Sequence, residues 1–149
     1  MITCQYGYTE IVKILLDRGA DWNICDKYSQ PPVMKAYENG RTERVKMLLD
    51  RGADCYICDW KGHSSVIKVC ANCYTEIVKM LLNRGADYNK CDMWGKSSIM
   101  MACEYGYTNI VKMLLESGAN CNDSNIYGQL YDCTFQVGGH KDKIRTISY

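Results

Sequence analysis

One twelve-residue segment occurs four times in this sequence, and successive copies start 33 residues apart. The copies are EIVKILLDRGAD at Glu10–Asp21, ERVKMLLDRGAD at Glu43–Asp54, EIVKMLLNRGAD at Glu76–Asp87 and NIVKMLLESGAN at Asn109–Asn120. A fixed period of this size is typical of stacked-repeat proteins, in which each unit buries its apolar face against the next copy. The repeat therefore constrains the possible folds more than any other feature of the chain.

Each copy has the pattern of a short amphipathic helix that stops at a glycine. In the third copy the apolar residues fall on one stripe of a helix: Ile77, Val78, Leu81 and Leu82. Thr75 is the expected N-cap, and Gly85 suits the left-handed conformation that closes a last turn. A helix of about three turns is marginal alone. We therefore expect the leucine pairs to form a continuous core: Leu48, Leu49, Leu81, Leu82, Leu114 and Leu115.

The period divides the chain, taken as one domain over 1–149, into units. We expect a partial unit at 1–25, full units at 26–58, 59–91 and 92–124, and a degenerate C-terminal capping unit at 125–149, with a weak final helix through Lys143, Ile144, Ile147 and Tyr149. Each full unit is predicted to contain a tight turn, a short helix and the longer helix. Gly62 and Gly95 suit positive φ in the turns, and Ser29 takes that place in the first.

The unit resembles the ankyrin repeat, through G-x-T-x-I-V-K-x-L-L-x-x-G-A-D at a constant spacing over Met1–Cys133. This resemblance implies an all-α solenoid of helix-turn-helix units with short hairpin-like turns. The family's T-P-L-H motif is replaced by PPVM, SSVI and SSIM, so Met34, Ile67 and Met100 stand where a histidine is usual. We therefore expect the hydrogen bonds of that histidine to be absent, and Ser64 and Ser97 to cap the short helices. The high Tyr, Cys, Lys and Asn content also resembles ankyrin proteins of large AT-rich DNA viruses.

Composition argues against several classes of function. The net charge is +1, and no apolar run approaches the roughly 20 residues of a membrane span. Ten cysteines include Cys55-x-x-Cys58 and Cys70-x-x-Cys73, a spacing that suits zinc. Most cysteines also recur at the repeat period, which favours reduced packing thiols over a metal site. We therefore expect no metal and no cofactor, and an intracellular, cytoplasmic or nuclear location, or the host cytoplasm for a viral protein.

Catalysis and nucleic-acid binding have little support. His63 and His140 lie on different units, and no phosphate-binding loop or paired-carboxylate motif occurs. A lysine recurs at Lys13, Lys46, Lys79 and Lys112, which is compatible with a phosphate-tracking stripe. A glutamate three residues before the first three of these lysines favours a solvated helix face instead. We predict a non-enzymatic protein for which nucleic acid and small-molecule substrates are unlikely partners.

The predicted binding surface lies at the turn tips. Ankyrin proteins commonly bind partners through these tips and the short helices, and Trp, Tyr and basic residues are enriched at interface hot spots. The resemblance assigns partner binding to Tyr28, Gln30, Trp60, Lys61, His63, Met93, Trp94, Lys96, Glu104 and Tyr105. The alternative is a structural spacer or a substrate-adaptor fragment of a longer array. The incomplete first unit also suggests end-to-end self-association through its uncovered N-terminal face.

Overall fold

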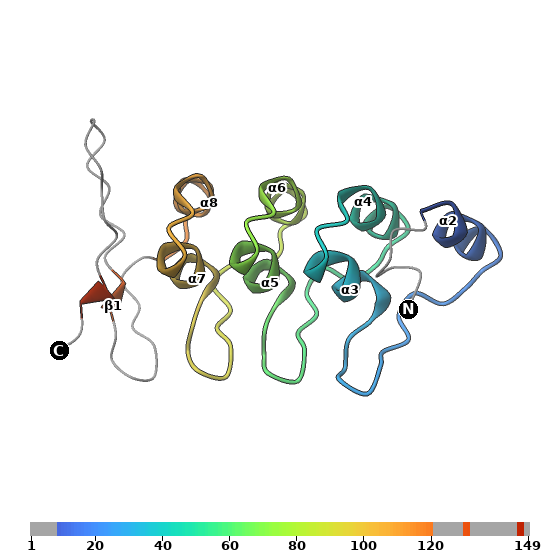
Figure 1. Ribbon diagram of the computed structural model, residues 1–149, viewed down its shortest axis with the longest axis horizontal. Coiled ribbons are helices and arrows are strands. Elements are labelled where there is room, and N and C mark those ends of the chain that lie inside the picture. Colours follow the sequence, from blue (N-terminus) through green and yellow to red (C-terminus); the bar gives the residue numbers. More distant parts are fainter. Residues whose placement is uncertain (1–8, 121–129, 132–145, 148–149) are drawn as a thin grey trace.

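The computed structural model describes residues 9–120, 130–131 and 146–147. These residues form seven α-helices: α2 (Thr9–Asp17), α3 (Pro32–Glu38), α4 (Thr42–Asp50), α5 (Ser65–Ala71), α6 (Thr75–Asn83), α7 (Ser98–Glu104) and α8 (Thr108–Glu116). The helices are arranged in two rows, with α3, α5 and α7 in one and α2, α4, α6 and α8 in the other (Figure 1). Long loops extend from the row of short helices on the side away from the long helices. The all-α solenoid is therefore confirmed.

The C-terminal part differs from the prediction at one position. Strands β1 (Leu130–Tyr131) and β2 (Thr146–Ile147) pair antiparallel, with Leu130 opposite Ile147. The weak final helix is therefore wrong at Ile147. The β-branched pair Thr146–Ile147 favours an extended backbone when a partner strand is available. Lys143, Ile144, Tyr149 and the rest of the predicted capping unit lie outside the described residues, as do residues 1–8 of the partial first unit.

The core follows the predicted stripe on the long helices, with one correction. Ile77, Val78 and Leu81 are fully buried between their neighbours. Leu48, Leu49 and Leu114 are buried too, but Leu82 and Leu115 are only partly buried. Successive residues on a helix point about 100° apart, so the second leucine of the pair reaches the edge of the stripe. The expected six-leucine core is therefore wrong at those two positions.

The short helices are buried more completely than the long ones. Met34, Ile67 and Met100, which replace the usual histidine, are all buried in the core. Ser64 caps α5, because its Oγ accepts a hydrogen bond from Ile67 N at 3.2 Å. Ser97 occupies the same place before α7 but makes no capping bond. The expected cap is therefore confirmed for Ser64 only.

The long helices start differently from the prediction. The N-cap of α6 is Tyr74, and Thr75 is already the first helical residue. The connection from α5 is short, and the carbonyl of Tyr74 accepts the first helical bond, from Val78 N at 3.0 Å. Thr75 as N-cap is therefore wrong. Thr75 already has helical backbone, so its hydroxyl is one residue too late for the N-cap position.

The turns need left-handed backbone at repeating positions. Gly62 and Gly95 have φ of 76° and 74°, as predicted, and Ser29 adopts 57° in the first turn. Each turn closes like a hairpin; in the second, Asp59 N donates to His63 O at 3.1 Å. Cys73 is the other non-glycine residue with positive φ in the described chain, at 60°, where the neighbouring units have Gly40 and Gly106.

Replacing Cys73 by glycine is expected to stabilise the protein by about 1 kcal/mol. A side chain in the left-handed region costs about that much, and glycine adopts this backbone without the penalty. The matched control is Cys91→Gly, because Cys91 is also exposed but has no positive φ. That change should leave stability unaltered or slightly lower. Urea unfolding measures both, and equal effects of the two substitutions would contradict the assignment of strain to residue 73.

Candidate functional site

One aspartate in each of the three turns stabilises that turn by hydrogen bonds to its backbone. Asp59 Oδ1 accepts hydrogen bonds from the backbone N–H groups of Lys61 (2.9 Å) and His63 (3.0 Å). Asp26 and Asp92 accept the equivalent pair of bonds in the first and third turns. Each aspartate carboxylate accepts these bonds from the backbone of its own turn. The carboxylates therefore point into the turns.

The neighbouring residues form what we call the tip ridge: Lys27, Tyr28, Trp60, Lys61, Met93 and Trp94. Tyr28, Trp60 and Met93 are 45%, 61% and 58% exposed, and Trp94 is half-buried. The Lys61 Nζ lies 5.0 Å from the ring centroid of Trp60 and 5.8 Å from that of Trp94. Lys27 Nζ lies 4.9 Å from the ring of Tyr28 in the same way. The ridge therefore combines large apolar rings with ammonium groups held over them.

The second and third turns are joined directly. Met93 N donates a hydrogen bond to Lys61 O at 3.0 Å. The His63 ring lies 5.7 Å from the Trp94 ring, with 37° between their planes. Its Nδ1 is 3.2 Å from Asp59 Oδ2, and its Nε2 is 3.6 Å from Asp92 Oδ2. His63 thus bridges the carboxylates of two successive turns and fixes the relative position of the aromatic rings.

A groove of about 300 Å³ adjoins the tip ridge between the first two full units. Its lining residues are Tyr28, Gln30, Lys35, Glu38, Asp59, Trp60, Lys61, His63 and Lys68. Its centre is the Lys68 ammonium, which lies 2.6 Å from Glu38 Oε1 and 2.9 Å from Asp59 Oδ2. Gln30 Nε2 donates to Glu38 Oε1 at 2.9 Å, and Lys35 Nζ is 3.4 Å from Glu38 Oε2. The groove floor is therefore an ion-paired network that links two units.

Burial and pairing act in opposite directions on the charges of this network. Burial alone raises the pKa of Glu38 and of Asp59, but the hydrogen bond and charge of Lys68 outweigh it. Both carboxyl pKa values therefore lie below their usual range. Burial alone lowers the pKa of Lys68, and its bonds to the two carboxylates more than reverse this, so the net shift is upward. All three groups are charged at neutral pH.

The structure places the predicted site residues in two groups. Tyr28, Gln30, Trp60, Lys61 and His63 line the groove, where Gln30 is a floor residue only 6% exposed. Met93 and Trp94 extend the tip ridge into the third turn.

The other three predicted residues lie on the third unit. Lys96 pairs with Glu104 at 2.6 Å, and Tyr105 stacks on Tyr107 with 5.7 Å between their ring centroids. This second group therefore forms a separate patch at the end of α7, beyond the residues that line the groove.

Sequence reasoning missed Lys35, Lys68 and Asp59. The sequence contains a pattern that could have identified them. The 33-residue period places aspartates at positions 26, 59 and 92 and lysines at positions 35 and 68. Charged residues that recur on or beside the short helices are in a position to form ion pairs between units. The sequence offered no sign that one lysine would reach carboxylates of two units.

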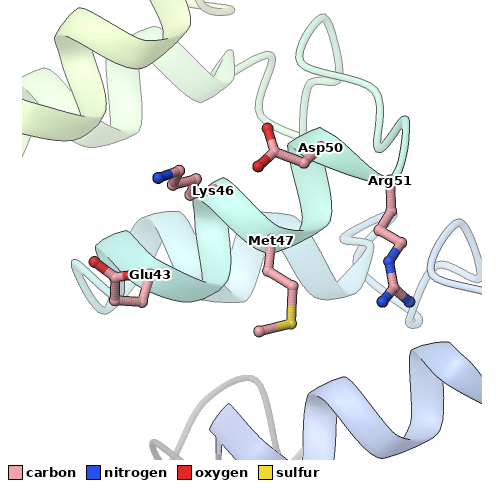
Figure 2. A pocket seen from close by; sticks show the side chains of 5 residues that line it. All are labelled: Glu43, Lys46, Met47, Asp50 and Arg51. Carbon is pink, nitrogen blue, oxygen red and sulfur yellow. The ribbon is translucent and has the colours of Figure 1, made fainter.

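A second hollow, of about 330 Å³, lies on α4 and is a poor candidate. It is lined by Glu43, Lys46, Met47, Asp50 and Arg51, of which Met47 and Arg51 point towards α2 while Lys46 and Asp50 point away (Figure 2). Arg51 Nη2 pairs with Asp17 Oδ1 at 2.5 Å, and Asp50 pairs with Arg84 of the next long helix. Arg51 and Asp50 are therefore already ion-paired with residues of neighbouring units.

The repeated lysine of the long helices is also a poor candidate for a binding site. Lys79 pairs with Glu76 at 2.9 Å, as the i, i+3 spacing predicts. Together with the Arg–Asp pairs between successive long helices, this makes the exposed face of the long helices a mixed-charge surface. A phosphate backbone would meet carboxylates along it.

Six of the described cysteines lie in the core or at the surface, and Cys58 is half-buried. Cys55, Cys70 and Cys103 are buried, whereas Cys25, Cys73 and Cys91 are exposed. Burial raises the pKa of the Cys70 and Cys55 thiols, which favours the protonated form. In residues 9–120, no three His, Cys, Asp or Glu side chains are grouped so that they could hold a metal ion.

The long helix of the first unit has an uncovered apolar face. Ile11, Ile14 and Leu15 are exposed, although Leu48 and Leu81, the counterparts of Leu15, are buried. The difference arises because the described residues place no further long helix on that side of α2. End-to-end self-association through this face stays a prediction, which sedimentation at several protein concentrations would test.

These elements define a helical repeat protein whose paired helices present turns and a polar groove on one side. A family model described as ankyrin repeats, in three copies, matches residues 1–92 and 33–125. The chain therefore belongs to the ankyrin-repeat proteins, a family that is typically non-enzymatic and whose repeats are generally protein–protein interaction modules. A comparison with curated proteins found no match. Within the described residues, no helix is both long and apolar enough to cross a membrane.

Proposed function

We propose that this protein is a non-enzymatic interaction module that binds a protein partner through the tip ridge and the adjoining groove. The observation that carries the proposal is the exposure of Tyr28, Trp60 and Met93 on successive turns beside a groove. Large apolar side chains in solvent-exposed turns do not contribute to the core, and tyrosine and tryptophan supply much of the binding energy at protein interfaces. The hydrogen bond from Met93 N to Lys61 O and the contacts of His63 with Trp94 and Asp92 hold this surface in one geometry before binding. This order lowers the entropic cost of association.

The Trp60→Ala, Trp94→Ala double variant is expected to lose capture of the partner from extracts of the native cell, while helical circular dichroism stays unchanged. Each truncation of a hot-spot aromatic removes about 2 kcal/mol or more, so the pair should weaken binding at least several-hundred-fold. The single Trp60→Ala variant covers the case in which Trp94, half-buried against His63, also affects folding.

The control is Tyr56→Ala. Tyr56 is 56% exposed, similar to Trp60, but its hydroxyl lies 3.4 Å from Arg84 O at the end of α6, away from the groove. Capture should survive this change. If the tryptophan variants bind as well as the unmodified protein, the site assignment is refuted and the spacer interpretation is favoured.

The free thiols of the described residues support a reducing compartment, which is part of this proposal. Five thiols in residues 9–120 carry this argument: Cys25, Cys55, Cys58, Cys70 and Cys73 are in no disulfide, and Cys55 and Cys70 are packed in the core.

A further inference from the structure

The charge that the tip ridge presents to solvent is positive, although the chain carries a net charge of only +1. The aspartates of the three turns are directed inward and accept bonds from their own loops. Within the part of the chain that the structure describes, Lys27 and Lys61 form no ion pair with a carboxylate. Their ammonium groups lie over the rings of Tyr28, Trp60 and Trp94 instead.

Lysines neutralise the acidic groups of the groove. Glu38 and Asp59 share Lys68, and Glu38 also lies close to Lys35. Asp92 faces the Nε2 of His63. In the described residues, neither Lys27 nor Lys61 has a carboxylate at ion-pairing distance, although the charge of Lys27 acts on the neighbouring Asp26. A ligand that approaches the ridge from solvent therefore meets these two ammonium groups first.

The two lysines are also preordered. An ammonium held over an aromatic ring, the phenol of Tyr28 for Lys27 and the indoles of Trp60 and Trp94 for Lys61, loses fewer side-chain conformations when an anion binds it. Less of the binding energy is then spent on ordering the side chain. The same indoles leave much of their surface exposed for an apolar side chain next to that anion. The ridge thus offers alternating sites for a carboxylate and for an apolar group.

We propose that the tip ridge binds an acidic, extended segment of a protein partner, with carboxylates at Lys27 and Lys61 and an apolar side chain against Trp60 and Trp94. This inference rests on the proposed function and specifies the chemistry of the partner. A nucleic acid fits less well, because strong phosphate binding needs many unpaired cations along a track. The other lysines of the groove, Lys35 and Lys68, are paired with carboxylates.

The experiment is a selection of random twelve-residue displayed peptides on the full chain, repeated on the Trp60→Ala, Trp94→Ala variant. Peptides that need the tryptophans should be enriched several-fold in Asp and Glu beside an aromatic or aliphatic residue. One such peptide, labelled with fluorescein, is then titrated by anisotropy. The Lys27→Ala, Lys61→Ala variant should raise its Kd by on the order of tenfold, and the loss should shrink at high salt.

The matched control is Lys13→Ala with Lys46→Ala, two exposed lysines of the long helices. It should leave the Kd unchanged. If the tryptophan-dependent peptides are neutral or basic, the acidic assignment is overturned while the proposed docking surface stands. If no peptide is enriched, or none depends on the tryptophans, the proposed function itself fails at this surface. Tighter, lysine-dependent binding of a labelled oligothymidylate that displaces the peptide would overturn the inference in favour of nucleic acid.

Discussion

Leu81→Ala is expected to lower the free energy of unfolding by about 3–4 kcal/mol, the largest expected effect of a single substitution on stability. Leu81 is fully buried on α6, the long helix that lies between α4 and α8. Removing three carbons from such a site loses the transfer free energy and leaves a cavity that neighbours fill only partly. Since domains of this size are stable by about 5–15 kcal/mol, the change removes a large share of the total.

The control for this prediction is the adjacent residue. Leu82 has the same side chain on the same helix but is only partly buried, so Leu82→Ala should cost about 1 kcal/mol. Urea unfolding followed by circular dichroism measures both variants. Equal losses for the two leucines would contradict the assigned burial and the direction of the apolar stripe.

Lys68→Met is expected to cost about 3 kcal/mol. Methionine is the residue that the third unit has at this position, as Met101, so it suits the helix. In the second unit it would leave Glu38 and Asp59 without the cation that neutralises them, and an uncompensated buried charge typically costs 3–5 kcal/mol. The control Lys79→Met removes an exposed lysine paired only with Glu76 and should cost under about 0.5 kcal/mol.

The same network sets an expected pH dependence. The carboxyl pKa values of Glu38 and Asp59 are lower in the folded chain than in the unfolded one, where they are about 4. Their contribution is therefore present above about pH 4 and is lost as the pH falls through the folded values. The pKa of Lys68 is raised, so its contribution is present below about pH 10 and is lost at higher pH.

Unfolding measured across pH tests this directly. Stability of the unmodified protein should fall steeply in acid, below about pH 4, and again in strong base. In Lys68→Met the acid loss should be shallower, since without this cation the carboxyl pKa values of Glu38 and Asp59 are lowered less. An unchanged acid limb in that variant would show that other carboxylates govern acid unfolding.

The class of fold and the place of the turns that carry the proposed binding surface followed from the sequence, because both depend on local periodicity. The 33-residue step of the IVKxLL segment identifies helices that need neighbours, and the glycines at 62 and 95 mark the turns. The aromatic residues of the tip ridge were predicted from the same register. Thr75 shows the limit of this reasoning, because a hydroxyl near a helix start does not reveal which backbone group makes the first bond.

Residues 9–120 thus owe their helices, turns and stacking order to the sequence alone, because each of these features arises within one unit and its copy. The tertiary structure decided which charges remain available. Lys61 and Lys68 are both lysines near one turn, seven residues apart. Packing of α5 against α3 brings the Lys68 ammonium to Glu38 of the preceding unit, while Lys61 stays over two indoles. Pairing of this kind depends on distances between units, which a one-dimensional pattern does not contain.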